Sequence, residues 1–315
     1  MNCNLDDIIK SSGKILLLSH MNPDGDTLGS MCAMYSAIYR RFKKKADMCV
    51  VSNVPYNYKF LPNVNLAERY FDKSLVYDLV ITLDVAAIER VMDAKILFEK
   101  AKCTVNIDHH KTNPKFGDYQ IIEADASSCG EVLFNYFKEH GWEIDEDAAV
   151  CLYTAIMTDT GNFRFENTSS KTLRAAADLI DKGANPNSIY KKCYETKTKN
   201  FVMFQNYCVN KAVFQADDKI AYTTVYKKDL EKYKAGDDYT DGIAETLRAI
   251  ASTEVSFVAK EVDTKLTKIS MRSKKLDVAN ICTKFGGGGH TFAAGCTIKA
   301  NVKDAVDMLL REIKL

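Results

Sequence analysis

The sequence has no long hydrophobic run and no excess of charge of one sign. No apolar stretch among its 315 residues approaches the roughly 20 residues that a membrane-spanning helix needs, which argues against a membrane partner. The N-terminus lacks the basic and then long apolar segments of a signal peptide, so we expect a cytoplasmic protein. The formal net charge of +1 argues against a protein that binds long duplex nucleic acid, because such proteins usually carry a basic excess.

Paired cysteines and abundant histidines are also missing. The ten cysteines are dispersed and form no CxxC pair, which argues against a cysteine zinc site and against a disulfide framework. The chain has five histidines, and four of them, His20, His109, His110 and His290, lie in polar motifs. Histidines gathered next to acids indicate a functional site.

The first half of the chain alternates strand and helix patterns. This alternation predicts an α/β domain with a doubly wound, mostly parallel sheet. Strands are expected at 15–18, 48–52, 79–84 and 104–108. Helices are expected at 28–42, 128–140, 145–157 and 170–182.

The length favours two domains. We expect a metal-binding catalytic domain at 1–186, a helical connector at 187–214 and a smaller C-terminal α/β domain at 215–315. In the last of these, strands are expected at 220–226, 255–262 and 266–271, and helices at 241–251, 278–285 and 302–313.

The segment "SHMNPDGDTLGS", residues 19–30, has two interpretations. It has the composition of a polar turn in which Asp26 or Thr27 caps the following helix. That interpretation gives no role to His20 or to a second carboxylate at Asp24. The alternative is that the segment forms half of a metal site.

Acids and histidines follow three of the expected strands. Asp84 ends the third strand, Asp108, His109 and His110 end the fourth, and Asp159 ends a helix. Ligands collect at the carboxyl ends of parallel strands, so these side chains are expected at one edge of the sheet. Gathered carboxylates repel one another unless they take up protons or bind cations. The expected ligands are His20, Asp24, Asp26, Asp84, His109 and Asp159.

Six ligands are too many for one ion that keeps an open position, so we expect two divalent ions that share one carboxylate. Carboxylate and imidazole ligands together suit Mn²⁺, with Mg²⁺ as the alternative. Such a pair generates hydroxide from water and stabilises the leaving oxygen of a phosphoester. The competing interpretation assigns each acid a separate structural role.

The segment "FGGGGHTFAAG", residues 285–295, lets backbone N–H groups approach an anion. It lacks the Gly-Lys-Ser/Thr ending of a nucleotide P-loop, which argues against an ATPase. His290 and Arg272 favour phosphate binding, since arginine can hold a phosphate with two hydrogen bonds. A plain glycine turn, and a structural ion pair for Arg272, stay open as alternatives.

These segments together resemble the DHH/DHHA1 phosphoesterases over nearly the whole chain. "SHMNPDGDTLGS", "ITLDVAAIER", "NIDHHKTNPKFG" and "YTAIMTDTGNFRFENTS" resemble the four DHH motifs in order. "MRSKKLDVANICTKFGGGGHTFAAG" resembles the DHHA1 signature. The compact length is similar to the NrnA-like branch of oligoribonucleases, which also dephosphorylate adenosine 3′,5′-bisphosphate (pAp). Thr27 departs from the small residue that is frequent at its position in the family.

The resemblance implies a role for each motif residue. It implies that His20 and Asp24 bind one Mn²⁺, that Asp26, His109 and Asp159 bind the other, and that Asp84 bridges them. His110 is expected beside the scissile phosphate and Asp108 is expected to orient the site. In an interdomain cleft, the substrate would be bound from the opposite domain by Arg272, Ser273, Gly288, Gly289 and His290.

The implied activity is hydrolysis of RNA or DNA fragments of about two to five nucleotides to 5′-mononucleotides by hydroxide attack, with 3′-phosphatase activity on pAp. A homodimer is compatible with the sequence. One alternative is a dedicated phosphodiesterase for the dinucleotides pApA or pGpG. A manganese pyrophosphatase and a non-catalytic nucleotide sensor are the others.

Overall fold

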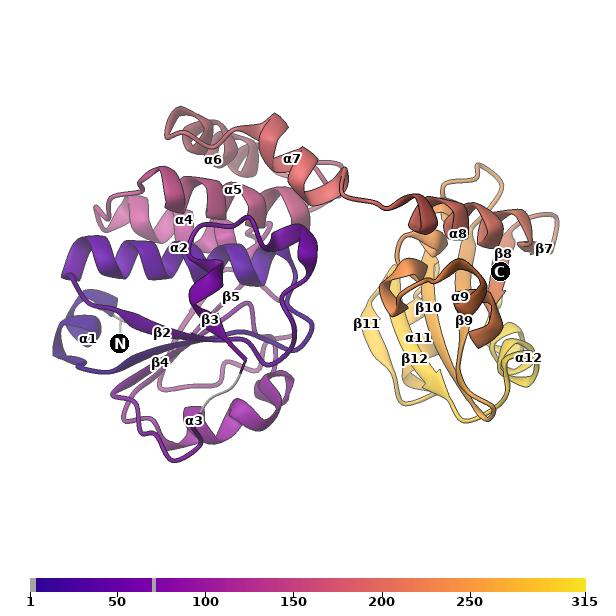
Figure 1. The fold of residues 1–315 in the computed structure, drawn as a ribbon, viewed down its shortest axis with the longest axis horizontal. Coiled ribbons are helices and arrows are strands. Elements are labelled where there is room, and N and C mark those ends of the chain that lie inside the picture. Colours follow the sequence, from indigo (N-terminus) through magenta and orange to yellow (C-terminus); the bar gives the residue numbers. More distant parts are fainter. Residues whose placement is uncertain (1–3, 70–71) are drawn as a thin grey trace. The chain divides into compact units, whose positions relative to one another are not determined.

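The computed structural model describes residues 4–69 and 72–315, which fold into two compact units, Met1–Thr196 and Lys197–Leu315 (Figure 1). Both units are of the α/β class, as the sequence predicts.

The first unit contains a parallel sheet flanked by helices. Its strands are β1 (Ile15–Leu18), β2 (Ala46–Cys49), β3 (Ala67–Glu68), β4 (Leu79–Leu83), β5 (Thr104–Asp108) and β6 (Tyr119–Ile122). Its α-helices are α1 (Leu5–Ser11), α2 (Gly25–Phe42), α3 (Lys95–Lys100), α4 (Cys129–Glu139), α5 (Glu146–Asp159), α6 (Ser170–Asp181) and α7 (Pro186–Tyr194). Short 3-10 helices are η1 (Tyr56–Tyr58), η2 (Val64–Leu66) and η3 (Ile88–Ala94).

The order of these strands places a topological switch point at the centre of the sheet. The described strands run β3-β2-β1-β4-β5-β6, and every pairing between neighbours is parallel. The chain leaves β1 towards one edge and continues from β4 towards the other, so the switch point lies between β1 and β4. Ligands bind at such points, outside the carboxyl ends of the strands.

Apolar side chains on both faces explain why the strands are buried. Leu17 and Ile81 pack in one cluster with residues of α2, α4 and α5, and Leu16 and Val80 pack in another with residues of α3. Figure 1 shows α2, α4 and α5 together on one side of the sheet and α3 on the other. A sheet covered on both faces reads in sequence as continuous apolar runs. Strand β2 begins two residues before the expected 48–52 and includes the exposed Asp47, which hid its start in the sequence.

The second unit contains a mixed sheet. Its strands are β7 (Val213–Gln215), β8 (Ile220–Val225), β9 (Val255–Asp263), β10 (Leu266–Ser273), β11 (Gly288–His290) and β12 (Ala293–Ile298). Its helices are α8 (Lys199–Asn210), α9 (Lys227–Tyr233), η4 (Asp237–Thr240), α10 (Ile243–Arg248), α11 (Val278–Thr283) and α12 (Val302–Glu312).

In this second sheet the described strands run β11-β12-β10-β9-β8-β7, with β8 and β9 parallel and the other pairs antiparallel. Phe257 and Met271 pack with residues of α11 and α12. Phe204 and Val258 pack in a separate cluster with residues of α10. Part of the glycine segment is the strand β11, which forms a hairpin with β12, so the alternative of a plain glycine turn is wrong for residues 288–290.

Two further findings concern the whole described chain. None of the helices within residues 4–69 and 72–315 is long and apolar enough to cross a bilayer. The cysteines in these residues are all free thiols, and most are buried.

Candidate metal centre and substrate site

The loop after β1 places one acid outside α2 and one inside it. Asp24 is the N-cap: its Oδ1 accepts hydrogen bonds from the N–H groups of Asp26 at 3.1 Å and Thr27 at 3.0 Å. The expectation that Asp26 or Thr27 caps this helix is therefore wrong, because both already lie in its first turn. Asp24 is exposed, and its Oδ2 is not used in these cap bonds.

Asp26 connects α2 to α4. Its Oδ2 accepts a hydrogen bond from the Cys129 N–H at 2.8 Å, and its Oδ1 accepts from Gly130 N–H at 2.9 Å and from the Ser30 hydroxyl at 3.2 Å. The carboxylate is buried at the N-terminus of α4, where the helix dipole favours negative charge.

Asp84 lies directly after β4 in a left-handed conformation, with φ of +59°. Its Oδ2 accepts a hydrogen bond from the Thr27 hydroxyl at 2.7 Å and lies 3.3 Å from His20 Nε2. Its Oδ1 is buried and accepts no hydrogen bond from any residue that the structure describes. A buried carboxylate oxygen without a donor is costly, and a cation is the partner that such an oxygen suits.

The hydrogen bonds of His20 and His109 fix their ring orientation. His20 Nδ1 lies 2.7 Å from the Met21 carbonyl, and His109 Nδ1 lies 3.3 Å from the Ala126 carbonyl. Because a carbonyl only accepts, the bond to Ala126 requires a proton on Nδ1 of His109 and leaves Nε2 as the metal-binding nitrogen of the neutral ring. His20 Nδ1 faces both the Met21 carbonyl and an Arg90 N–H group, and its Nε2 faces Thr27 and Asp84. A donor bond from Nδ1 that orients Nε2 is usual for histidine metal ligands.

The predicted ligands gather in groups of the size a metal ion needs. One group consists of His20, Asp24 and Asp84, and another of Asp26, His109 and Asp159, with the ligand atoms in each group within 4.8 Å of one another. His109 Nε2 lies 3.7 Å from Asp84 Oδ1, so Asp84 also approaches the second group. A third group consists of Asp84, Asp108, His109 and His110, so the three groups overlap at Asp84 and His109. The assignment of the predicted ligands to two ions stays a prediction.

The acids among the predicted ligands lie close enough to repel one another when no cation is bound. Burial and the charges of Asp84 and Asp159 raise the pKa of Asp26 well above its ordinary value. Partial burial and the charges of Asp84 and Asp24 raise the pKa of Asp159 in the same direction. Burial lowers the pKa of His20, but the hydrogen bond and charge of Asp84 outweigh it and raise that pKa. The orphaned oxygen, the oriented imidazoles and the crowded carboxylates therefore fit divalent cations.

His110 is held by a separate network. Its Nδ1 donates to Asp108 Oδ1 at 2.8 Å, and Asp108 Oδ2 accepts from the Asn113 amide at 2.5 Å. The same amide donates to Asn106 Oδ1 at 2.8 Å. Burial lowers the pKa of His110, but the Asp108 hydrogen bond and the charges of Asp84 and Asp108 raise it to about 9. The acids around His110 therefore favour its protonated form.

Three residues near the centre were not assigned functional roles from the sequence. The Thr27 hydroxyl bridges His20 Nε2 and Asp84. Asn113 holds Asp108, and Arg90 places an N–H group 3.2 Å from His20 Nδ1. All three lie inside the quoted motifs, but their contacts depend on the neighbouring strands and loops, which local spacing does not show.

In the second unit, strand register groups two of the predicted substrate residues. Arg272 on β10 and His290 on β11 both pair with Ala293 on β12. Directly opposed residues share a face of a sheet, so Arg272 and His290 flank the small Ala293 side chain. Arg272 Nε also donates to Glu245 Oε1 at 2.7 Å, so the alternative of an ion pair is realised as well.

The other predicted substrate residues differ in their surroundings. Ser273 is buried, and its hydroxyl donates to the Leu276 carbonyl. Gly288 and Gly289 lie in β11 and are exposed. Gly289 has φ of +147°, and a Cβ there would meet the Ala293 carbonyl oxygen at 2.5 Å, so the hairpin requires glycine at this position.

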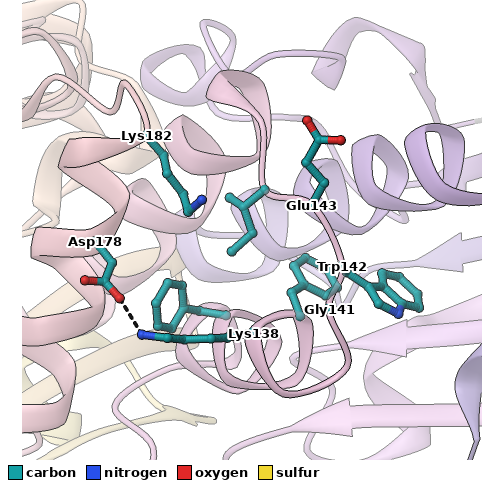
Figure 2. A pocket seen from close by; sticks show the side chains of 9 residues that line it. Lys138, Gly141, Trp142, Glu143, Asp178 and Lys182 are labelled. Carbon is teal, nitrogen blue, oxygen red and sulfur yellow. Dashed lines mark hydrogen bonds and ion pairs between the residues drawn. The ribbon is translucent and has the colours of Figure 1, made fainter.

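A surface hollow of about 260 Å³ lies at the C-terminal end of α4 (Figure 2). An ion pair of 2.6 Å between Lys138 and Asp178 lies beside it. None of its lining residues belongs to the groups of metal-ligating side chains, so we do not assign the chemistry to it. The lining residues are Phe134, Phe137, Lys138, Gly141, Trp142, Glu143, Ile144, Asp178 and Lys182.

Comparison with known families gives two matches. Residues 14–156 match the N-terminal domain of the DHH family, and residues 217–315 match the DHHA1 domain.

Comparison with individual proteins gives relatives of similar length. The chain is 28% identical over 307 residues to the bifunctional oligoribonuclease and PAP phosphatase NrnA of Bacillus subtilis, covering 95% of this chain and 93% of the relative. It is 27% identical over 304 residues to the protein of the same name from Thermus thermophilus, covering 96% and 90%. A crystal structure of an exopolyphosphatase-related protein from Bacteroides fragilis matches with a TM-score of 0.92 at 26% identity, covering 98% and 93%.

Proposed function

The chain belongs to the DHH/DHHA1 family of phosphoesterases, and from that premise we propose that it hydrolyses short oligonucleotides to 5′-mononucleotides and removes the 3′-phosphate of pAp. Relatives named for both activities align with more than nine tenths of this chain. We propose two Mn²⁺ ions as the cofactors, with Mg²⁺ as the alternative.

The observation that carries the proposal is the position of Asp84 between two groups of ligands. Its Oδ2 lies 3.3 Å from His20 Nε2, and its Oδ1 lies 3.7 Å from His109 Nε2. One carboxylate with an oxygen towards each group is what a pair of bridged cations needs. Such cations, when bound, supply an activated water and neutralise charge on the phosphoryl oxygens.

The chain's own residues supply the rest of the chemistry. His110, held by Asp108, donates a hydrogen bond to a phosphoryl oxygen, and that bond strengthens as negative charge builds up on it. Asp108 is a positioning residue, because its oxygens are occupied by His110 and Asn113. Asp84 holds the two ligand groups in place.

We propose that the second unit binds the terminal phosphate of the substrate. Arg272, His290 and the exposed glycines of β11 provide donors on neighbouring strands. The ion pair with Glu245 holds the Arg272 guanidinium through Nε, and Nη1 donates to the Met271 carbonyl at 2.8 Å. Nη2 is the nitrogen that we propose for the phosphate. Short substrates fit this arrangement, because a near-neutral protein neutralises few phosphates.

The test is an assay of labelled oligoribonucleotides of increasing length, with pAp and pApA, in Mn²⁺ and in chelator. We expect Mn²⁺-dependent loss of the shortest substrates and of pAp, and no activity in Asp84→Ala. Asp147→Asn is the matched control, because Asp147 is an exposed acid on α5, the helix that carries Asp159. Activity that survives Asp84→Ala would refute the two-ion site.

The substrate profile separates the alternatives. Turnover of pApA or pGpG with five-mers and pAp left intact indicates a dedicated dinucleotide phosphodiesterase. Rapid turnover of pyrophosphate with inert pApA indicates a pyrophosphatase. Binding of pAp or pApA in Mn²⁺ without cleavage of either indicates a nucleotide sensor.

A further inference from the structure

The turn that follows Asp159 has an unusual backbone. Gly161, Asn162 and Phe163 are consecutive and all left-handed, with φ of +56°, +61° and +62°. Left-handed backbone costs roughly 1–2 kcal/mol for each residue with a side chain, and such strain gathers at ligand-binding positions. Asp159 itself belongs to one of the groups of metal-ligating side chains.

Hydrogen bonds hold this strained turn in one conformation. Asn162 N–H donates to the Met157 carbonyl at 2.7 Å, and the N–H groups of Arg164 and Phe165 both donate to the Thr160 carbonyl at 3.0 Å. Arg164 Nε donates to the Gly161 carbonyl at 2.7 Å. The turn is therefore rigid as well as strained.

The two phenylalanines of this turn, Phe163 and Phe165, differ in their surroundings. Phe163 is half-buried and packs edge-on against Tyr153, with ring centroids 5.9 Å apart. Phe165 lies over Gly161, where a Cβ would come within 2.4 Å of its ring atoms, yet it is 48% exposed. The exposed ring of Phe165 thus packs on the backbone of Gly161, two residues from Asp159.

We propose that Phe165 is a stacking platform for a nucleobase of the substrate, a proposal that rests on the function proposed above. Aromatic rings stack on any base without reading its sequence. A single exposed phenylalanine is common on protein surfaces and needs no explanation. This one differs because a strained, hydrogen-bonded turn beside a metal-ligating acid holds it. Arg164 directly precedes Phe165 in the chain and is exposed, and its guanidinium provides a cation for the adjoining phosphate.

The direct test uses fluorescence of the protein loaded with Mg²⁺, because bound cations offset the carboxylates that would otherwise repel the phosphate of AMP. Phe165→Trp places an indole on the proposed platform, and the single native Trp142 is buried and bonded to Asp6 through its Nε1, so it serves as a constant background. We expect AMP to quench the new signal and ribose 5-phosphate, which lacks the base, to leave it unchanged. Absence of quenching up to millimolar AMP, or equal quenching by both ligands, would overturn the proposal.

The kinetic test compares pApA with an analogue in which one base is absent. In Phe165→Ala we expect KM for pApA to rise about tenfold or more, from the cost of losing a base–aromatic stack, while KM for the abasic analogue stays unchanged. Tyr39→Ala is the matched control, because Tyr39 is 49% exposed and lies near the far end of α2. An equal rise in KM for both substrates would show a structural role and refute the platform.

The two tests also separate this proposal from the function on which it rests. Cleavage of pApA by the wild type without any effect of Phe165 substitution refutes the platform alone. Base-dependent quenching of Phe165→Trp in a protein that cleaves no oligonucleotide refutes the hydrolytic function and retains the base site.

Discussion

Asp26 and Gly130 are joined by a hydrogen bond of 2.9 Å across a sequence separation of 104 residues. The second carboxylate oxygen of Asp26 accepts from the Cys129 N–H at 2.8 Å. The first N–H groups of a helix have no partner within the helix, so this acid on α2 satisfies two of them in α4. Asp26 is therefore a structural acid whether or not it also binds a metal ion.

Replacing Asp26 tests this double role. Asp26→Ala leaves two buried N–H groups without an acceptor, at a cost of roughly 1–3 kcal/mol for each. Removing a charge that Asp84 and Asp159 repel offsets part of this loss. We expect the free energy of unfolding in chelator to fall by about 1–3 kcal/mol. Urea denaturation with excess chelator measures it.

Asp26→Asn provides the comparison, because its amide oxygen retains one of the two hydrogen bonds. We expect a smaller loss of stability in chelator than in Asp26→Ala, and in both variants a weaker stabilisation by Mn²⁺. Asp147→Asn, on the exposed side of α5, serves as the control that changes charge alone. If Asp26→Ala has the same urea midpoint of unfolding as the wild type, the proposal that Asp26 stabilises the N-terminus of α4 is wrong.

The parallel sheet could be predicted from the sequence because its signals are local. The strand expected at 15–18 is an apolar run, the one at 104–108 is rich in β-branched residues, and β1 and β5 occupy these ranges. The hairpin of β11 could not be predicted in this way, because glycines carry little strand propensity. Only its pairing with β12 makes it a strand, and such pairing is a tertiary contact.

The candidate site also has a part that the sequence predicts and a part that it does not. The residues that form its ligand groups could be identified, since acids and histidines at the ends of strands are visible in sequence. The hydrogen bonds that hold these ligands and their neighbours in place could not be predicted. Asp26 bonds to α4, and Asn113, in the loop after β5, bonds back to Asn106 on β5, through contacts that depend on the three-dimensional arrangement. The left-handed turn before Phe165 could not be predicted in full either, because Gly161 and Asn162 tolerate a left-handed backbone whereas Phe163 gives no such signal.

Asp84→Asn tests the shared carboxylate without an activity assay. A ligand that binds only the folded state stabilises it by about 2.7 kcal/mol at a concentration one hundred times its dissociation constant. We expect Mn²⁺ to raise the melting temperature of the wild type and to have little effect on Asp84→Asn. The reason is that one carboxylate contributes to both groups of ligands.

Differential scanning calorimetry over a range of Mn²⁺ concentrations measures this effect, and Asp147→Asn should behave as the wild type does. An equal shift in Asp84→Asn and wild type would show that Mn²⁺ stabilises the protein from another site. Isothermal titration then gives the number of ions bound, for which we expect two.

Asn113→Ala tests the network behind His110. The substitution removes the donor to Asp108 Oδ2 and to Asn106 Oδ1, both buried. We expect kcat for pApA to fall about tenfold to hundredfold, since small misplacement of a catalytic group is costly. KM should stay near the wild-type value, because Asn113 bonds to buried acceptors behind His110.

The control for this variant is Asn135→Ala, which removes an amide that donates to the side chain of Glu123 at the surface. A rise in KM without a fall in kcat would contradict a positioning role. A proportional loss of folded protein, measured by circular dichroism, would attribute the effect to stability instead.

Asp78 makes the stability of the first unit depend on acid pH. Its Oδ2 accepts from the N–H groups of Gly13 and Lys14, both at 2.8 Å, and its Oδ1 accepts from Lys102 at 2.8 Å. The hydrogen bond from Lys102, followed by those from the backbone, lowers the pKa of Asp78 to about 2 from an unfolded value of 3.8. The folded carboxylate therefore releases its proton more readily than the unfolded one.

A lowered pKa in the folded state gives stability that is present above pH 3.8 and is lost as pH falls towards 2. Asp78→Asn removes this titration, so we expect its unfolding free energy to decline less steeply than that of the wild type between pH 4 and 2. Urea denaturation at closely spaced pH values measures the two slopes. Asp93→Asn is the control, because Asp93 also pairs with a lysine but is 80% exposed. Equal slopes in wild type and Asp78→Asn would show that Asp78 does not link folding to protonation, since a carboxylate with the same pKa in both states contributes no slope.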